Sequence, residues 1–308
     1  YGKTWIEVLK PDPLSCFISP LKMSPLDENL IFGGSRQLIK SVDNGKVWNS
    51  LSSNPTSAPI NSIELSRRNK SVLAFSTMPD PSQTARLFLS VDEGKTSKEI
   101  SNLLPNRIVN DIAFHPKSDS MMLVSLGGFG NEHLYVSQDF GIHWEAIGNG
   151  LPDAPFHTVA YNMQNPDFIF AGCDLGLFAS DNGGKTWINY TDSDLDVVQV
   201  YDLLYLNTEN KILAFTHGRG VFKMNADFRL PTGLKTISSK VGRNEFISNK
   251  NQLKEYLENF TTGKMYSIDG QMIHYSIENI YNHWDQIQNG VYFLATSKRT
   301  IKIIVTGH

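Results

Sequence analysis

The sequence has little of what a disulfide-stapled or membrane-spanning protein needs. Its 308 residues include only 2 cysteines, Cys16 and Cys173. They are too few and too far apart in sequence to form the dense disulfide framework of a small secreted domain. We therefore expect two buried free thiols. No run of about 18 apolar residues occurs, which excludes a membrane-spanning helix.

Charge is also scarce. Lys, Arg, Asp and Glu make up 19% of the residues, the formal net charge is −3, and no stretch gathers Lys and Arg. Binding to nucleic acid phosphates requires such a stretch, so nucleic acid is excluded as a partner. The remaining composition, 40% hydrophobic and 11% aromatic, favours a folded all-β protein. Neither an initiator methionine nor a signal peptide precedes Tyr1, and we expect an N-terminal portion to be missing.

A short phrase recurs over the first two thirds of the chain. Each copy contains a glycine. In the last four copies the glycine follows Ser-x-Asp or Ser-x-Asn, and in the first copy it stands before Lys-Thr-Trp. These glycines are Gly2, Gly45, Gly94, Gly141 and Gly184, spaced 43, 49, 47 and 43 residues apart. One four-stranded propeller blade takes roughly 40 to 50 residues. The period therefore predicts one blade per phrase.

Each repeat also contains the strands that a blade needs. A hairpin pattern precedes the phrase, as in Phe168–Phe178, and a further strand begins each unit. These first strands are predicted at Ile60–Leu65, Val109–Phe114, Phe156–Tyr161 and Val200–Tyr205. The last unit has no phrase after its hairpin at Ile212–Phe222, so it supplies three strands, and Thr4–Leu9 is a candidate for the fourth.

The repeats resemble the Asp-box, or bacterial neuraminidase repeat, whose phrase reads Ser-x-Asp-x-Gly-x-Thr-Trp and joins the third and fourth strands of a blade. The resemblance implies a structural role for its residues, with the carboxylate pinning the turn and the tryptophan packing at the outer rim. They are Ser41, Asp43, Gly45, Trp48, Ser90, Asp92, Gly94, Ser137, Asp139, Gly141, Trp144, Ser180, Asn182, Gly184 and Trp187. We expect an all-β fold: a propeller with five visible units of a larger ring, followed by a small β-sandwich.

The tail follows a different pattern. Residues 1–229 are assigned to the propeller, 230–257 to a polar linker, and 258–308 to a separate β domain with strands at Lys264–Ile268, Gln271–Tyr275, Val291–Leu294 and Ile301–Val305. This order is similar to the C-terminal sorting domains of type IX secretion substrates in Bacteroidetes. The resemblance implies the type IX machinery as a partner and a secreted or outer-membrane-associated location. A small sandwich that caps the propeller is the alternative.

Catalytic chemistry has weak support in the residues. A sialidase needs three arginines that clamp a carboxylate, and the arginines here are few and scattered. The blades also resemble those of xyloglucanases, which use two carboxylates as acid and base, and Asp111 and Asp202 are the candidates. When the first strands are aligned, Asn61, Asn110, His157 and Tyr201 stand one residue before the position that Asp111 and Asp202 occupy. These four residues and the two aspartates are predicted to lie at the mouth of an axial tunnel.

Two functions remain open at this stage. The first is an exported scaffold that binds a protein or glycan, as in the sortilin family, whose blades these repeats resemble. The second is a xyloglucanase-like or sialidase-like hydrolase with catalytic residues partly in the missing N-terminal portion. We expect no cofactor and no metal, because Asp43-Asn-Gly45 lacks the spaced oxygens of a calcium loop. His217 and Arg219 are expected to fix their own hairpin.

Overall fold

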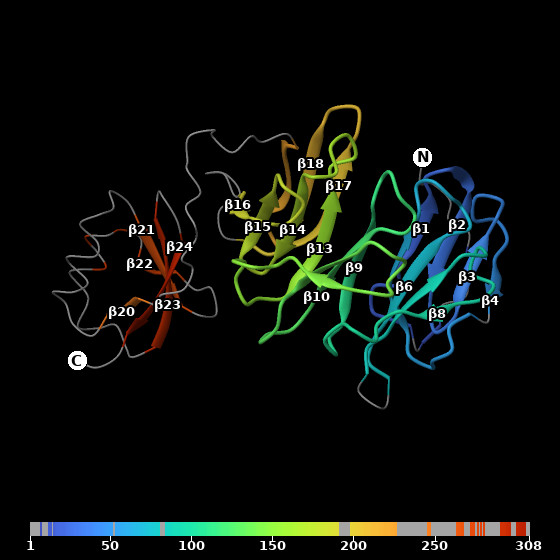
Figure 1. Cartoon of the computed structure of the whole chain (residues 1–308), viewed down its shortest axis with the longest axis horizontal. Helices are drawn as coiled ribbons and strands as arrows, with labels where there is room; N and C mark the ends of the chain where they lie inside the picture. Colours follow the sequence, from blue (N-terminus) through green and yellow to red (C-terminus); the bar gives the residue numbers. More distant parts are fainter. Residues whose placement is uncertain are drawn as a thin grey trace. The chain divides into compact units, whose positions relative to one another are not determined.

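The computed structural model divides into two compact units, Tyr1–Leu230 and Pro231–His308 (Figure 1). In the first unit the structure describes residues 7, 12–13, 15–51, 53–80, 84–190 and 198–226. In the second it describes 245–247, 263–267, 272–274, 276, 278, 280, 290–296 and 300–305. No helix in these ranges is long and apolar enough to cross a membrane.

The first unit contains five antiparallel sheets that follow one another along the chain as propeller blades. Blade 1 is β1 (Leu21–Ser24), β2 (Asp27–Gly34), β3 (Leu38–Ser41) and β4 (Asn49–Leu51). Blade 2 is β5 (Ile60–Leu65), β6 (Leu73–Thr77), β7 (Leu87–Ser90) and β8 (Lys98–Glu99). Blade 3 is β9 (Val109–Phe114), β10 (Met122–Leu126), β11 (Leu134–Ser137) and β12 (Glu145–Ala146).

Blade 4 is β13 (Phe156–Tyr161), β14 (Ile169–Cys173), β15 (Gly176–Ser180) and β16 (Ile188–Asn189). Blade 5 has three described strands, β17 (Val200–Leu206), β18 (Lys211–Thr216) and β19 (Gly220–Asn225). The all-β propeller prediction is thus confirmed. The first phrase at Tyr1–Trp5 lies outside the described residues, as does all of the candidate strand Thr4–Leu9 except Glu7.

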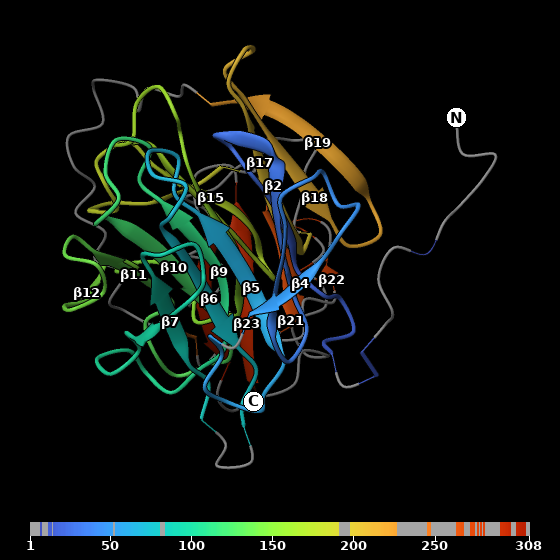
Figure 2. The same ribbon diagram turned by 90° about the vertical axis from the view of Figure 1, so that its right-hand side faces the viewer.

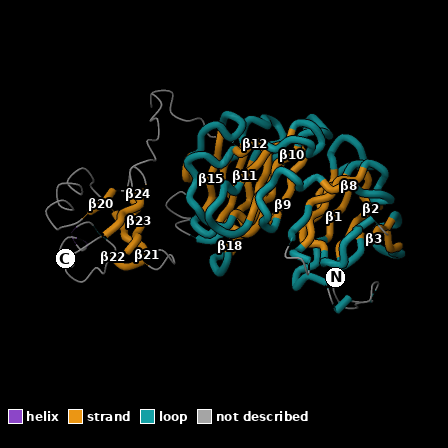
Figure 3. The backbone as a smooth tube through the Cα atoms, turned by 60° about the horizontal axis from the view of Figure 1, so that its bottom comes forward, coloured by secondary structure: helices purple, strands orange, loops and turns teal. Residues whose placement is uncertain are grey.

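Neighbouring blades pack face to face, and their first strands contact one another in the order β1, β5, β9, β13, β17. Figure 2 shows the strands of blade 2 beside those of blade 3, and Figure 3 shows strands inside with loops at their ends. Each interface is apolar; between blades 2 and 3 it includes Leu87, Ile112 and Val124. Burial raises the pKa of the Cys173 thiol to about 12. Cys16 is only half-buried, so the expectation of two buried thiols is wrong for it.

The second unit contains one five-stranded sheet in the order β20, β24, β23, β21, β22. The strands are β20 (Glu245–Ile247), β21 (Gly263–Ser267), β22 (Met272–His274), β23 (Gly290–Thr296) and β24 (Thr300–Val305). All neighbours are antiparallel except β20 and β24, which pair in parallel. Strand β20 therefore lies within the segment 230–257 that the sequence assigned to a linker.

Candidate functional site

Each of the first strands in blades 2 to 5 carries a β-bulge near its start. The register skips one residue between Ile60 and Ser62, between Val109 and Asp111, between Phe156 and Thr158, and between Val200 and Asp202. The skipped residues are Asn61, Asn110, His157 and Tyr201, four of the six residues predicted to form a site. A bulge re-aims the side chain that it carries. We call this end of the four strands the bulge end.

Two of the bulge residues join one blade to the next. The Asn61 side-chain amide donates a hydrogen bond to the carbonyl oxygen of Val109 at 3.0 Å, and Asn110 donates to that of Phe156 at 2.8 Å. Both acceptors directly precede the bulge of the next blade. Asn61 and Asn110 are therefore cross-links between blades, and their amide N–H groups already have partners.

Blade 4 departs from this pattern because its bulge residue is a histidine. His157 Nε2 lies 2.7 Å from Asp174 Oδ1, and Asp174 Oδ1 also accepts from Gln199 Nε2 at 3.0 Å. The His157 ring stacks on Tyr201 of blade 5, with ring centroids 4.4 Å apart and planes within 10°. Blades 4 and 5 therefore meet at the bulge end through aromatic rings.

The ring row continues to His217, whose centroid lies 5.6 Å from that of Tyr201. His217 is exposed, and Tyr201 is 48% exposed. The hairpin that bears His217 is closed by Thr216 Oγ1, which donates to the Gly220 carbonyl at 2.7 Å. His217 thus contacts the neighbouring ring, whereas we expected it to fix its own hairpin. Arg219 is exposed beside it.

Asp111 is half-buried between blades 3 and 4. Its Oδ2 accepts from Thr158 Oγ1 at 2.9 Å and from the Val159 amide at 3.0 Å, while Oδ1 accepts from the Ile112 amide at 2.9 Å. Burial raises the pKa of Asp111 to about 6, against the opposing effects of Lys22 and of the Val159 amide. Both oxygens are thus occupied by the protein itself, which is the arrangement of a structural carboxylate.

Asp202 occupies the same register in blade 5 but is exposed, and its Oδ1 accepts from the Leu203 amide at 2.8 Å. Two charged residues that sequence reasoning missed lie near this pair. Lys22 of β1 binds Glu64 of β5 at 2.8 Å. Glu64 raises the pKa of Lys22 above its usual value, with smaller effects of the same sign from Asp111 and Asp202. Strand alternation, which puts Ser62 and Glu64 on one face of β5, was the signal available for Glu64.

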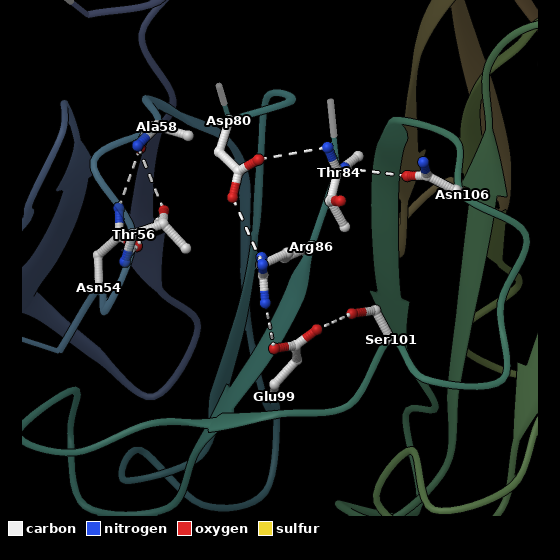
Figure 4. A network of polar contacts seen from close by, with 10 residues as sticks. Asn54, Thr56, Ala58, Asp80, Thr84, Arg86, Glu99, Ser101 and Asn106 are labelled. Atoms are coloured by element: carbon white, nitrogen blue, oxygen red, sulfur yellow. Dashed lines mark hydrogen bonds and ion pairs between the residues drawn. The ribbon is translucent and has the colours of Figure 1, made fainter. Parts of the chain in front are cut away.

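Loops at the bulge end of blade 2 are held by one guanidinium (Figure 4). Arg86 binds Glu99 at 2.8 Å and Asp80 at 3.4 Å, and Glu99 accepts from the Ser101 hydroxyl at 2.9 Å. Asn54 connects loops of blades 1 and 2, because its side-chain amide donates to the carbonyl oxygens of Arg36 and Ala58. These contacts stabilise the framework around the site.

The recurring phrases form the turns between third and fourth strands of blades 1 to 4, called the repeat turns below. In blade 1 the Ser41 hydroxyl donates to Asp43 Oδ1 at 2.8 Å and accepts from the Gly45 amide at 2.9 Å, and Asp43 Oδ1 accepts from the Val47 amide at 2.9 Å. The same bonds recur from Ser90, Ser137 and Ser180. Trp144 and Trp187 donate to Ile100 and Ile147 of the preceding blade at 2.9 and 2.6 Å. The aspartates are thus engaged within their own turns.

The described residues contain no group of three or more His, Cys, Asp or Glu placed to hold a metal ion. What the bulge end offers instead is a row of partly exposed rings on a cross-linked frame. It combines apolar ring area with hydrogen-bonding edges, which suits contact with a ligand better than it suits proton transfer.

Comparisons with known proteins agree with this fold. The family model Sortilin-Vps10, described as "Sortilin, neurotensin receptor 3", matches residues 36–171. Sortilin from Rattus norvegicus and from Mus musculus is 28% identical over 110 residues, which cover 33% of this chain and 13% of each sortilin.

Three solved structures extend the likeness. An ancestral GH74 enzyme has a TM-score of 0.57 at 16% identity, covering 73% of this chain and 32% of its own. The GH74 xyloglucanase from Xanthomonas campestris has 0.55 at 13%, covering 69% and 37%. The extracellular domain of a putative hybrid two-component system from B. thetaiotaomicron has 0.50 at 13%, covering 95% and 34%. The chain thus spans about a third of these structures, and it is a β-propeller similar to sortilin and to GH74 enzymes.

Proposed function

We propose that this chain belongs to a secreted or cell-surface propeller scaffold that binds a protein or glycan ligand at its bulge end. The observation that supports this is the row of His157, Tyr201 and His217, in which Tyr201 is 48% exposed although both neighbours contact its ring. Partly exposed aromatic side chains on a rigid frame lose little conformational entropy when they bind.

The geometry of the carboxylates argues against hydrolysis. A glycosidase acid must reach the glycosidic oxygen with its own proton, while a second carboxylate acts as base or nucleophile. Asp111 accepts three hydrogen bonds from the protein, and these hold both of its oxygens. A carboxylate fixed in this way stabilises the contact between blades 3 and 4.

The test is binding by the purified chain to arrays of glycans and of peptides. Tyr201→Ala and His217→Ala should each weaken binding by roughly tenfold, about 1.4 kcal/mol. Ile142→Ala is the matched control, because Ile142 is also exposed but lies in a repeat turn at the opposite end of its blade. Equal loss in the control would remove the bulge end as the site. Turnover of a β-glucan or sialoside that Asp111→Asn abolishes would establish the hydrolase instead.

We also propose that the tail is an export address read by the type IX machinery. Support comes from the order of its strands, with β21 and β22 as a hairpin and β23 paired to the last strand β24. Deletion of residues 259–308 should retain the protein in the periplasm of a host with type IX secretion and leave the melting of the propeller unchanged. Normal export together with a large loss of stability would identify the tail as a cap.

A further inference from the structure

Blades 2 and 3 each have a blade on both sides, so the ends of their strands are the surfaces that they leave open. We call the end opposite the bulge end the turn end. In these two blades it consists of the loop between the first and second strands, residues 66–72 and 115–121, and of the repeat turn, residues 91–97 and 138–144. Because both neighbours of each blade are present, exposure at this turn end is a property of the blades themselves.

Hydrogen bonds join these four segments into one surface. In each blade an amide of the repeat turn donates to a carbonyl oxygen of the loop, Glu93 to Ser71 at 2.9 Å and Phe140 to Ser120 at 2.8 Å. Between the blades, the Ser66 hydroxyl donates to the carboxylate of Asp119. The basic and apolar side chains described next therefore belong to a single, fixed surface.

The repeat turns of this surface carry exposed apolar side chains. Val91 in blade 2 is 59% exposed, and Phe140 and Ile142 in blade 3 are 38% and 57% exposed. The positions of Phe140 and Ile142 hold the charged residues Glu93 and Lys95 in blade 2. Phe140 also has φ +61°, a conformation that is strained for a bulky side chain. Strain of this kind gathers at functional sites, which points to a role for Phe140 outside the fold.

The same surface is positively charged, although the net charge of the chain is −3. Its exposed cations are Arg67, Arg68, Lys70, Lys95 and Lys117. Four carboxylates lie among them, each with a partner in the protein: Asp92 and Asp139 in their own turns, Glu93 with Lys40 at 2.5 Å, and Asp119 with Ser66. Counted with Lys40, six cations therefore stand against four carboxylates.

We propose that the turn end of blades 2 and 3 binds the surface of a membrane that contains anionic lipids. Lys and Arg attract negatively charged headgroups, and apolar side chains beside them enter the boundary between headgroups and acyl chains. A soluble polyanion would engage the cations but leave Val91, Phe140 and Ile142 in water, so the combination favours lipid. The bulge end lies at the other end of the strands and stays open to its own ligand.

The experiment is sedimentation of the 308-residue chain with vesicles of phosphatidylglycerol and phosphatidylcholine in equal parts, beside vesicles of phosphatidylcholine alone. The wild type should bind the mixed vesicles more tightly by at least about tenfold, and added salt should weaken this binding. Arg67→Glu should weaken it by about tenfold, because it reverses a charge at the contact. Arg107→Glu is the matched control, since Arg107 is exposed at the bulge end, and it should bind as the wild type does.

Phe140→Asn tests the apolar part of the contact. Asparagine stands at this position in blade 1, as Asn44 with φ +57°, so the turn should form, and circular dichroism with thermal melting checks that it does. The substitution should weaken binding to the mixed vesicles by roughly tenfold. Phe129→Asn is its control, because Phe129 is 61% exposed but lies at the bulge end between β10 and β11.

Three results would overturn the proposal. The first is a wild type that binds neither kind of vesicle or binds both equally. The second is a loss of binding in the two controls equal to the loss in the two turn-end variants, or no loss in any of them. The third is weakened binding in Arg67→Glu with none in Phe140→Asn, which would show that the surface holds anions without contacting lipid hydrocarbon and would make a soluble polyanion its ligand.

Discussion

The Ser97 hydroxyl donates a hydrogen bond to the carbonyl oxygen of Ser53 in the preceding blade. In the next two blades the same position holds a tryptophan, whose indole N–H donates across the junction to Ile100 or Ile147, two repeat positions before the one that Ser53 occupies. Loss of the tryptophan in blade 2 therefore leaves the outer link between blades in place. The junction thus keeps a side-chain hydrogen bond although both the donor residue and the acceptor position differ.

The glycine of each repeat turn should be irreplaceable where it meets the preceding blade. Gly141 has φ +79°, and a Cβ there would lie 2.6 Å from Ile100. We expect Gly141→Ala to lower the free energy of unfolding by about 3 kcal/mol through backbone strain and overlap combined. Gly183→Ala is the control, because Gly183 has φ +70° but nothing within 4 Å, and it should cost only about 1 kcal/mol. Urea titration measures both, and equal losses would contradict the overlap.

The residue before that glycine offers a stabilising substitution. Phe140 has φ +61°, a left-handed conformation that is unfavourable for a bulky side chain, and the residue is 38% exposed. Asparagine tolerates this conformation and stands at the equivalent position in blade 1, as Asn44 with φ +57°. Phe140→Asn should raise the free energy of unfolding by about 0.5–1 kcal/mol. An unchanged or lower melting temperature would show that the Phe140 ring packs more usefully than its exposure indicates.

The repeat turns should respond to strong acid. Backbone N–H groups, first those of Thr96 and His143, lower the pKa of Asp92 and Asp139 to about 2. A carboxylate with a lowered folded-state pKa stabilises the fold above its unfolded pKa near 4, and the effect disappears as pH falls towards 2. Asp92→Asn and Asp139→Asn should therefore flatten the loss of melting temperature between pH 4 and pH 2. Asn182→Asp should steepen it, because blade 4 naturally has the uncharged residue.

Asp111 should act in the opposite sense. Its folded-state pKa is raised to about 6, so the folded protein holds a proton that the unfolded chain has already lost. The resulting stabilisation is complete below about pH 4 and is lost as pH rises through 6. Replacement with asparagine should remove this part of the slope between pH 4 and pH 6. A wild-type slope that survives Asp111→Asn would assign the titration to another group.

Local patterns in the sequence were sufficient to predict the blades. Alternation places β5, β9 and β13 at the residues where the structure has them, because each strand carries its apolar positions in its own sequence. The partners of the site residues could not be predicted in this way. Thr158 and Val159 reach Asp111 from a strand 47 and 48 residues away, and Lys22 meets Glu64 through the stacking of two blades.

The bulges were beyond local reasoning for the same reason. A bulge is defined by pairing with another strand, so Asn61 and His157 look like ordinary strand residues until β6 and β14 are in register. The pairing of His157 with Asp174 depends in addition on the turn that follows β14. Alignment of the first strands of the repeats with one another identified these four positions. Only the pairing of the strands in three dimensions showed that each of them is a bulge.

The cross-links from Asn61 to Val109, from Asn110 to Phe156 and from Trp144 to Ile100 all span about one repeat of sequence. Each of these cross-links therefore joins a blade to its immediate neighbour. In such a nearest-neighbour system, stability is approximately a sum over blades and junctions. Under a stretching force applied at the two ends of the unit, the propeller should extend in steps of one blade, with the outermost blade released first.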